Sequence, residues 1–252
     1  MSELIFYDIP GKSDASKAWS INTWNTRFAL NFKGLKYKTE WVEYPDIEAV
    51  CKKIGAGPTT TKSDGVTPHY TLPVLYDPST KAVVPDSTAI ADYLDKTFPD
   101  TARLFPPGTR ALYNSFADEF ELAVMTPLFL LSVLATCRNL NQRSFEYFKK
   151  TRTEAYGDLE SITPEGAEKT DGVWSDLERG LAKVAGWIET GGGAFLGGES
   201  PNYADIRLAA ALIWGRIVLG RDSERWRRII SFDGGRWERF LDQFEPYTAV
   251  DN

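Results

Sequence analysis

The chain has 252 residues, of which 42% are hydrophobic and 25% charged, and this composition is typical of globular domains. Its formal net charge of −6 argues against a nucleic-acid-binding protein, because such proteins carry a basic face. The two cysteines, Cys51 and Cys137, make no metal or redox motif, and one histidine cannot build a multi-histidine site, so we expect no metal and a reducing compartment.

The first third of the chain alternates between strand-like and helix-like patterns. A buried strand is expected over 4–7, a helix over 20–32, a second strand over 36–44 and a helix from 45 to about 54. The Gly-, Pro- and Thr-rich stretch 55–68 predicts a loop. The N-terminus lacks a basic segment with a long apolar core, and no apolar run reaches the ~18 residues of a membrane span, so we expect a cytoplasmic protein.

Residues 69–99 carry two short apolar runs around a proline-containing turn, followed by a helical pattern. The runs 72–76 and 82–84 predict a β-hairpin. Ser87 precedes apolar residues at spacings of three and four, and it is a natural N-cap for that helix. A carboxylate and a hydroxyl at a helix N-terminus can hold a small zwitterion, because backbone donors bind its carboxylate and Asp86 binds its ammonium. The alternative for this pair is an ordinary helix cap.

The second half of the chain predicts helices only. Residues 100–108 are proline-rich and predict a linker between a domain of residues 1–99 and an all-helical domain of residues 109–252. The order before the linker is βαβαββα, in which a crossover helix implies parallel strands and the closing hairpin is antiparallel. Apolar periodicity predicts the later helices over 109–138 (with a kink at Pro127), 144–156, 174–190, 205–219 and parts of 226–244, with a loop over 161–172.

Two landmarks resemble the glutathione transferases. Leu72-Pro73-Val74-Leu75 matches the strand that carries a cis-proline in this family, and Asp86-Ser87 matches the acidic residue and serine that grip the γ-glutamyl end of glutathione. Residues 195–206 match the pattern F-L-x-G-x-x-x-(S/T)-x-A-D, in which the aspartate, here Asp205, belongs to a capping box that starts a buried helix. The resemblance implies a thioredoxin-like α+β N-terminal domain, an all-α C-terminal domain, glutathione as co-substrate and a homodimer.

The stretch 19–35 resembles the first helix of the etherase-like transferases, a group that includes bacterial β-aryl ether-cleaving enzymes and the fungal-specific class A. This resemblance implies that Ser20 activates the glutathione thiol and that Asn22 assists through its amide side chain or its backbone N–H. Activation is needed because a thiol with a pKa of about 8.5 is only about 3% ionised at pH 7, and the thiolate is the nucleophile.

Two parts of the expected glutathione site stay open. Tyr7, Ser13 and Ser16 are rivals of Ser20 as the activating group, and Ser20 can also be a plain helix N-cap. The main chain of Leu72 is expected to pair with the cysteinyl part of glutathione. The glycyl carboxylate needs a cation, and the candidates before the hairpin are Lys52, Lys53, Lys62 and His69.

The acceptor site is expected between the two domains, with mostly aromatic and aliphatic walls. Its predicted walls are Ile21, Thr23, Trp24, Tyr113, Phe116, Phe120, Met125 and Phe129. Aromatic residues on a helical stripe are more often core than pocket. The resemblance implies a transferase that conjugates glutathione to aromatic, wood- or plant-derived phenolic compounds or cleaves their ethers. The alternatives are a ligandin-type binding protein with weak or no turnover and a non-catalytic regulator.

Overall fold

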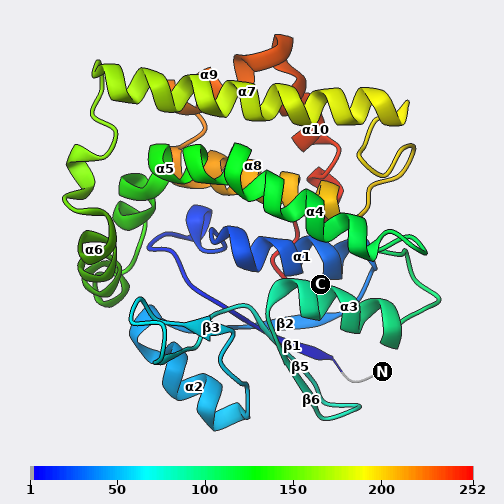
Figure 1. Cartoon of the computed structure of the whole chain (residues 1–252). Coiled ribbons are helices and arrows are strands. Elements are labelled where there is room, and N and C mark those ends of the chain that lie inside the picture. The colour runs from blue at the N-terminus through cyan, green and yellow to red at the C-terminus, as the bar shows by residue number, and fades with distance from the viewer. Residues whose placement is uncertain (1–2, 252) are drawn as a thin grey trace.

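The computed structural model describes residues 3–251, and its N-terminal part is built on a four-stranded mixed sheet (Figure 1). The strands are β1 (Leu4–Asp8), β2 (Tyr37–Trp41), β5 (Val74–Asp77) and β6 (Ala82–Pro85). Their order is β2-β1-β5-β6, with β1 parallel to β2 and the other neighbouring pairs antiparallel. The helices of this part are α1 (Ile21–Phe32), α2 (Ile47–Ile54) and α3 (Ser87–Thr97). The expected thioredoxin-like fold is therefore confirmed.

A second, two-stranded sheet lies where a loop was predicted. β3 (Thr60–Thr61) and β4 (Pro68–His69) pair in antiparallel fashion. Asp64 closes the turn between them, because its carboxylate accepts hydrogen bonds from the amides of Val66 and Thr67. The prediction missed these strands because a two-residue strand is too short to show an alternating apolar pattern.

Different helices cover the two faces of the sheet (Figure 1): α1 and α3 lie on one face and α2 on the other. Side chains of β1 alternate between these faces. Phe6 and Asp8 contact Arg27 of α1, whose guanidinium lies 5.0 Å from the centre of the Phe6 ring and 2.8 Å from the Asp8 carboxylate. Tyr7 points to the opposite face, where Cys51 of α2 is one of its neighbours.

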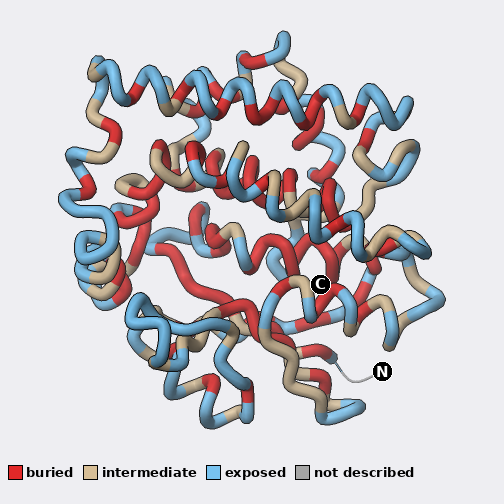
Figure 2. The backbone as a smooth tube through the Cα atoms, in the orientation of Figure 1, coloured by how far each residue is buried: buried red, intermediate tan, exposed pale blue. Residues whose placement is uncertain are grey.

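The rest of the chain is helical and packs above the N-terminal part in the view of Figure 1. Its helices are α4 (Arg110–Phe120), α5 (Thr126–Arg138), α6 (Gln142–Tyr156), α7 (Glu168–Gly191), α8 (Tyr203–Leu219), α9 (Glu224–Ser231) and α10 (Arg236–Asp242). α8 is central, because α1, α4, α5 and α10 all contact it, and Figure 2 shows that the helices around it turn their buried residues inward. Asn202 and Asp205 form the predicted capping box at its start.

α4 and α5 form one long helix that a π-helical turn, Glu121–Met125, interrupts. This turn directly precedes Pro127, where a kink was predicted, and it widens the helix ahead of a residue that has no N–H and whose ring crowds the preceding turn. α7 packs closely here, since a Cβ at Gly180 would overlap the carbonyl of Ala123.

By length and composition, residues 110–138 can cross a membrane, which corrects our expectation that no such segment exists. In the structure 56% of the apolar window is buried, and the core helix of a soluble protein passes the same test.

α7 begins at Glu168, within the stretch 161–172 that was predicted as a loop. Its first turn holds Glu168 and Asp171, whose negative charges favour a helix N-terminus. This turn is polar and largely exposed, so it has no apolar periodicity from which a helix is predicted.

Candidate active site

The start of β5 lies beside the end of β1, near the point where α1 begins. In the β1–β5 pairing Val74 is opposite Tyr7, so Pro73 lies level with the carboxyl end of β1. The peptide bond between Leu72 and Pro73 is cis, as the resemblance implied. The amide of Asp86 donates a hydrogen bond of 3.3 Å to the carbonyl of Pro73. The predicted proline and the start of α3 therefore share one edge of the sheet.

Asp86, and not Ser87 as predicted, is the N-cap of α3. Its Oδ1 accepts hydrogen bonds of 2.9 Å from the amides of Thr88 and Ala89. Asp86 has a φ of +76°, and residues in such conformations cost about 1–3 kcal/mol and cluster at functional sites. The side chain is exposed, and no group within residues 3–251 donates a hydrogen bond to its Oδ2. This oxygen is free to accept an ammonium group.

Ser20 is the N-cap residue of α1, but its hydroxyl does not cap the helix. Its backbone carbonyl accepts the first hydrogen bond of the helix, from the Trp24 amide, and another from the Thr23 hydroxyl, each at 2.9 Å. Ser20 is 4% exposed, and Asn22 is exposed in the first turn. The Ser20 hydroxyl is thus left free at the positive end of a helix, and the alternative of a plain side-chain cap does not describe it.

The other residues considered for activation of the thiol lie in less suitable positions than Ser20. Tyr7 lies on the α2 face of the sheet, and burial, followed by the charge of Glu40, raises the pKa of its hydroxyl. A raised pKa makes that hydroxyl a weaker acid and a poorer donor to a thiolate. Ser13 and Ser16 bind each other, with their hydroxyl oxygens 2.7 Å apart. The geometry therefore favours Ser20.

Three lysines considered for the glycyl carboxylate lie on α2 and the β3–β4 hairpin. Lys52 forms an ion pair of 2.7 Å with Glu48, and Lys62 lies 3.7 Å from the same carboxylate. Lys53 is exposed. Ion pairs at such exposed positions contribute about 0–1 kcal/mol, so either paired lysine can leave Glu48 for a ligand.

His69 and a cation missed by the sequence analysis lie beyond the lysines. The pKa of His69 is lowered first by burial and then by the charge of Arg152, so the imidazole is neutral at pH 7 and a poor partner for a carboxylate. Arg152 comes from α6, with its guanidinium 4.7 Å from the Phe148 ring centre and no ion-pair partner within the described residues. No sequence signal places Arg152 here, because only tertiary packing brings α6 to this edge of the sheet.

Within residues 3–251 no group of three or more His, Cys, Asp or Glu residues is placed to bind a metal ion.

Two of the eight predicted acceptor-site residues, Tyr113 and Phe116, line a hollow of about 290 Å³ on the helical part. Phe105 and Trp187 complete its aromatic wall, and the exposed Leu112 lies at its rim. Its lining comes from residues 104–116, 187 and 196–204, and so not from α1. The hollow is aromatic, as expected, but it does not adjoin Ser20.

The other six predicted residues lie elsewhere. Thr23, Trp24, Phe120 and Met125 are buried in the core, Ile21 is half-buried, and Phe129 lies against Tyr156 with ring centres 5.3 Å apart. No single hollow in the structure is lined by all eight, and for the residues that follow Phe120 the shape of the long helix gives the reason. The π-helical turn changes the phase of the helix, so an apolar stripe that is continuous in the sequence faces different neighbours before and after it.

Comparisons with known proteins agree on one family. The model described as glutathione S-transferase, N-terminal domain, matches residues 19–97, and that described as glutathione S-transferase, C-terminal domain, matches residues 111–247. The glutathione S-transferase-like protein ustS of Aspergillus flavus is 33% identical over 258 residues, which cover 92% of this chain and 85% of that protein.

Solved structures give the same result. The glutathione transferase GSTFuA3 of Phanerochaete chrysosporium is 48% identical, with a TM-score of 0.94 and 100% of both chains covered. A glutathione S-transferase of Ceriporiopsis subvermispora, solved in complex with glutathione, is 45% identical, with a TM-score of 0.94 and 100% of both chains covered.

Proposed function

The chain belongs to the glutathione S-transferase family, and we propose that it is a serine-type member in which Ser20 activates the glutathione thiol. The observation that carries this proposal is the free hydroxyl of Ser20 at the N-terminus of α1. Tyr7 faces the α2 side of the sheet, and no cysteine occupies this position. The resemblance of residues 19–35 to the etherase-like transferases supports the same assignment.

The energy required of this arrangement is modest. To make most of the thiol ionise at pH 7, its pKa must fall by roughly two units, which corresponds to nearly 3 kcal/mol of preference for the thiolate. A hydrogen bond to a charged group contributes about 1.5–3 kcal/mol. The positive end of a helix adds about 0.3–1 kcal/mol, or up to ~2 kcal/mol in a partly buried site. Ser20 and the N-terminus of α1 together supply enough.

The other groups of glutathione would bind along the same edge of the sheet. Its γ-glutamyl ammonium would bind Asp86 Oδ2, and its γ-glutamyl carboxylate would bind the amide and hydroxyl of Ser87, because the amides of Thr88 and Ala89 already donate to Asp86 Oδ1. The cysteinyl part would pair with the main chain of Leu72, next to Pro73. The glycyl carboxylate would then point toward Lys52, Lys62 and Arg152. The glutathione complex of the relative from Ceriporiopsis subvermispora supports glutathione as the co-substrate.

The acceptor in this proposal is an aromatic, oxygenated electrophile, to which glutathione is conjugated or whose aryl ether it cleaves. The test is the turnover of a chlorodinitrobenzene and of a β-aryl ether by the wild type, Ser20→Ala and, as a control from the preceding loop, Ser13→Ala. At pH 7 we expect Ser20→Ala to lower kcat/KM roughly 25-fold, the ratio of thiolate fractions with and without a two-unit pKa shift.

The pH dependence separates activation from a structural effect. At pH 9.5 glutathione is mostly ionised without help, so the loss caused by Ser20→Ala should nearly disappear. Ser13→Ala should match the wild type at both pH values. A loss of equal size at both pH values would mean that Ser20 does not act through the thiol pKa.

A second candidate function, ligand binding without turnover, is favoured by the aromatic hollow on the helical part. Tyr113, Phe116 and Trp187 line it, and such rings bind flat aromatic ligands. Because Trp187 is in the wall, a phenolic ligand should quench tryptophan fluorescence, and Trp187→Phe should remove that part of the signal while leaving the other tryptophans. If phenolics bind but are never consumed in the presence of glutathione, the binding function replaces the enzymatic one.

A further inference from the structure

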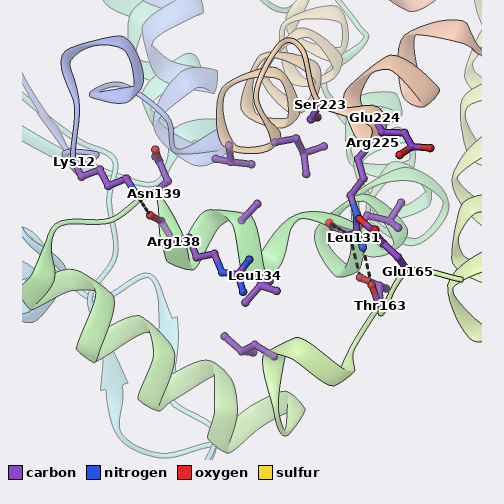
Figure 3. A pocket seen from close by; sticks show the side chains of 14 residues that line it. Lys12, Leu131, Leu134, Arg138, Asn139, Thr163, Glu165, Ser223, Glu224 and Arg225 are labelled. Carbon is purple, nitrogen blue, oxygen red and sulfur yellow. Dashed lines mark hydrogen bonds between the residues drawn. The ribbon is translucent and has the colours of Figure 1, made fainter. Parts of the chain in front are cut away.

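Two cations that line a hollow of about 450 Å³, where the β1–α1 loop meets α5 and α9, are bonded to backbone carbonyls (Figure 3). The Nζ of Lys12 donates a hydrogen bond of 2.5 Å to the carbonyl of Arg138. The guanidinium of Arg225 donates to the carbonyls of Leu131 and Thr163, each at 2.6 Å. These donors are used within the chain, in contrast to a set of buried polar groups beside α3.

Three polar groups that have no hydrogen-bond partner within residues 3–251 are buried together where α4 and α8 meet. They are the hydroxyls of Tyr113 and Tyr203 and the Nε of Arg207. Tyr203 and Arg207 are four residues apart on α8 and so share one face of it, and the ring of Tyr113 lies 5.2 Å from that of Tyr203. A buried polar group without a partner is unfavourable, so a small rotation that supplies a partner is favoured.

The two tyrosine hydroxyls face the first residues of α3. Burial raises the pKa of both, and the side chains that act on them as hydrogen-bonding groups are Thr88 for Tyr113 and Ser87 for Tyr203. With its pKa raised, the Tyr203 hydroxyl keeps its proton at neutral pH and can act as a donor. Ser87 is only 7% exposed, and its hydroxyl lies close to that of Tyr203 without forming a full hydrogen bond.

The direction of the Ser87 proton depends on what bonds to its oxygen. A serine hydroxyl has one proton and two lone pairs, and its proton rotates to suit its partners. If a donor behind Ser87 occupies a lone pair, the Ser87 proton is left for a group on the outer side. Hydrogen bonds linked in this way polarise and strengthen one another.

We propose that Tyr203 is a positioning residue for glutathione, because its hydroxyl donates to Ser87 Oγ and thereby directs the Ser87 proton to the γ-glutamyl carboxylate. This inference rests on the proposed function, which places that carboxylate at Ser87. Through Tyr203 the first turn of α8, in the helical part, contributes to binding at the start of α3.

Arg207 supports this arrangement from behind. Its guanidinium is fixed by an ion pair of 2.9 Å with Glu121 of the π-helical turn. Its positive charge opposes the rise in the pKa of Tyr113 and of Tyr203, which makes each hydroxyl a better donor. A positive charge behind a chain of donors also favours an anion at the far end of that chain.

Calorimetry on the full chain with two peptides tests the role of Tyr203. One peptide is glutathione, and the other is 4-aminobutanoyl-cysteinylglycine, which keeps the ammonium and the thiol but lacks the γ-glutamyl carboxylate. The wild type should bind glutathione roughly tenfold more tightly, because hydrogen bonds to a charged group are strong. Tyr203→Phe should weaken glutathione roughly fivefold, as expected for one hydrogen bond in a polarised chain, and should leave the analogue unchanged.

A double variant shows whether Tyr203 acts through Ser87. Ser87→Ala should reduce the preference for glutathione, and adding Tyr203→Phe to it should cause no further loss, because the two residues then share one interaction. Tyr37→Phe is the matched control. Tyr37 is 1% exposed like Tyr203, and its hydroxyl donates at 3.0 Å to the Ala249 carbonyl. This variant should bind both peptides like the wild type.

Three results would overturn the role of Tyr203: an equal loss for both peptides in Tyr203→Phe, no loss for either, or an undiminished loss in the Ser87→Ala background. If Ser87→Ala still reduced the preference for glutathione, the placement of the γ-glutamyl end would stand and only this inference would be wrong. Equal binding of the two peptides by the wild type would contradict that placement itself, and the role of Tyr203 would fall with it.

Discussion

Asp8 and Arg27 form an ion pair of 2.8 Å in which neither side chain is open to solvent. Asp8 ends β1, and Arg27 lies in the middle of α1, so the pair fixes the helix against the sheet on the face away from Tyr7. The same guanidinium donates to the Tyr37 hydroxyl at 3.1 Å and to the carbonyl of Val250, which ties the C-terminal segment to the N-terminal part.

Removing Arg27 should therefore be strongly destabilising. Arg27→Met leaves Asp8 as a buried charge without a partner, and breaking a buried pair in this way costs about 3–5 kcal/mol. Arg143→Met is the matched control, because Arg143 and Asp46 are also 2.8 Å apart but 62% and 43% exposed. This exposed pair should be worth about 0–1 kcal/mol. Urea unfolding measures both, and equal losses would contradict the assigned role of burial.

Asp86 is predicted to bind the ammonium of glutathione, in addition to capping α3. Asp86→Asn keeps an oxygen for the amides of Thr88 and Ala89 but removes the charge, so the stability of α3 should change little while glutathione affinity falls at least roughly tenfold. Asp92→Asn, an exposed acid on the same helix, is the control and should bind glutathione like the wild type. Calorimetric titration gives the affinities. Unchanged glutathione affinity in Asp86→Asn would show that the γ-glutamyl end does not bind at this position.

His69 should titrate below its usual pKa of 6.5, because burial and the charges of Arg152 and Lys62 disfavour its protonated form. The folded chain then binds fewer protons here than the unfolded chain. This group's contribution to stability is present above pH 6.5 and is lost as the pH falls toward the folded pKa. Since the chain has one histidine, a proton NMR titration gives a single curve. Arg152→Gln should move that curve upward, and Lys96→Gln, on α3, should not.

A pKa of His69 at or above 6.5 in the wild type would contradict this environment. It would also return His69 to the candidates for the glycyl carboxylate, because a protonated imidazole binds an anion well. Glutathione binding should then raise the His69 pKa further, and the same NMR signal would report it.

The homodimer expected for the family stays a prediction, and two exposed leucines suggest where its contact lies. Leu112 of α4 is 69% exposed, and Leu122 of the π-helical turn is 71% exposed. Light scattering at micromolar concentration should give twice the 28.3 kDa of one chain. Leu112→Glu or Leu122→Glu should shift the mass toward that of one chain, because a charge in an apolar contact is costly. Val66→Glu, at another exposed apolar position, is the control. A wild-type mass of one chain would exclude a stable dimer.

The sequence predicted the elements that carry an apolar period or a motif. The β1 strand, the α1 helix, the hairpin of β5 and β6 and the capping box of Asn202 and Asp205 all have such a signal, and each is present. The register of the same hairpin places Pro73 beside Asp86, because Val74 pairs with Pro85 and the next residues along the two strands then meet. The cap itself was misassigned by one residue, since Asp and Ser are both good N-caps and composition alone does not separate them.

The parts that were not predicted depend on tertiary packing. Arg152 reaches the edge near His69 only because α6 packs against the segment that starts α2. The acceptor wall predicted from the sequence does not form one hollow in the structure, and for Met125 and Phe129 the π-helical turn before Pro127 gives a local reason, because it changes the direction of an apolar stripe. β3 and β4 are two residues each, too short for any periodic signal.

The assignment of Ser20 is the central claim, and the thiolate absorbance of the glutathione-bound protein, followed against pH, tests it most directly. Saturating glutathione should titrate in the wild type with a pKa roughly two units below the free thiol value of about 8.5, and in Ser20→Ala it should return close to that value. Tyr7→Phe and Ser13→Ala should titrate like the wild type. If Ser20→Ala keeps the wild-type pKa, Ser20 is not the activating residue, and a shift in Tyr7→Phe would give that role to Tyr7 instead.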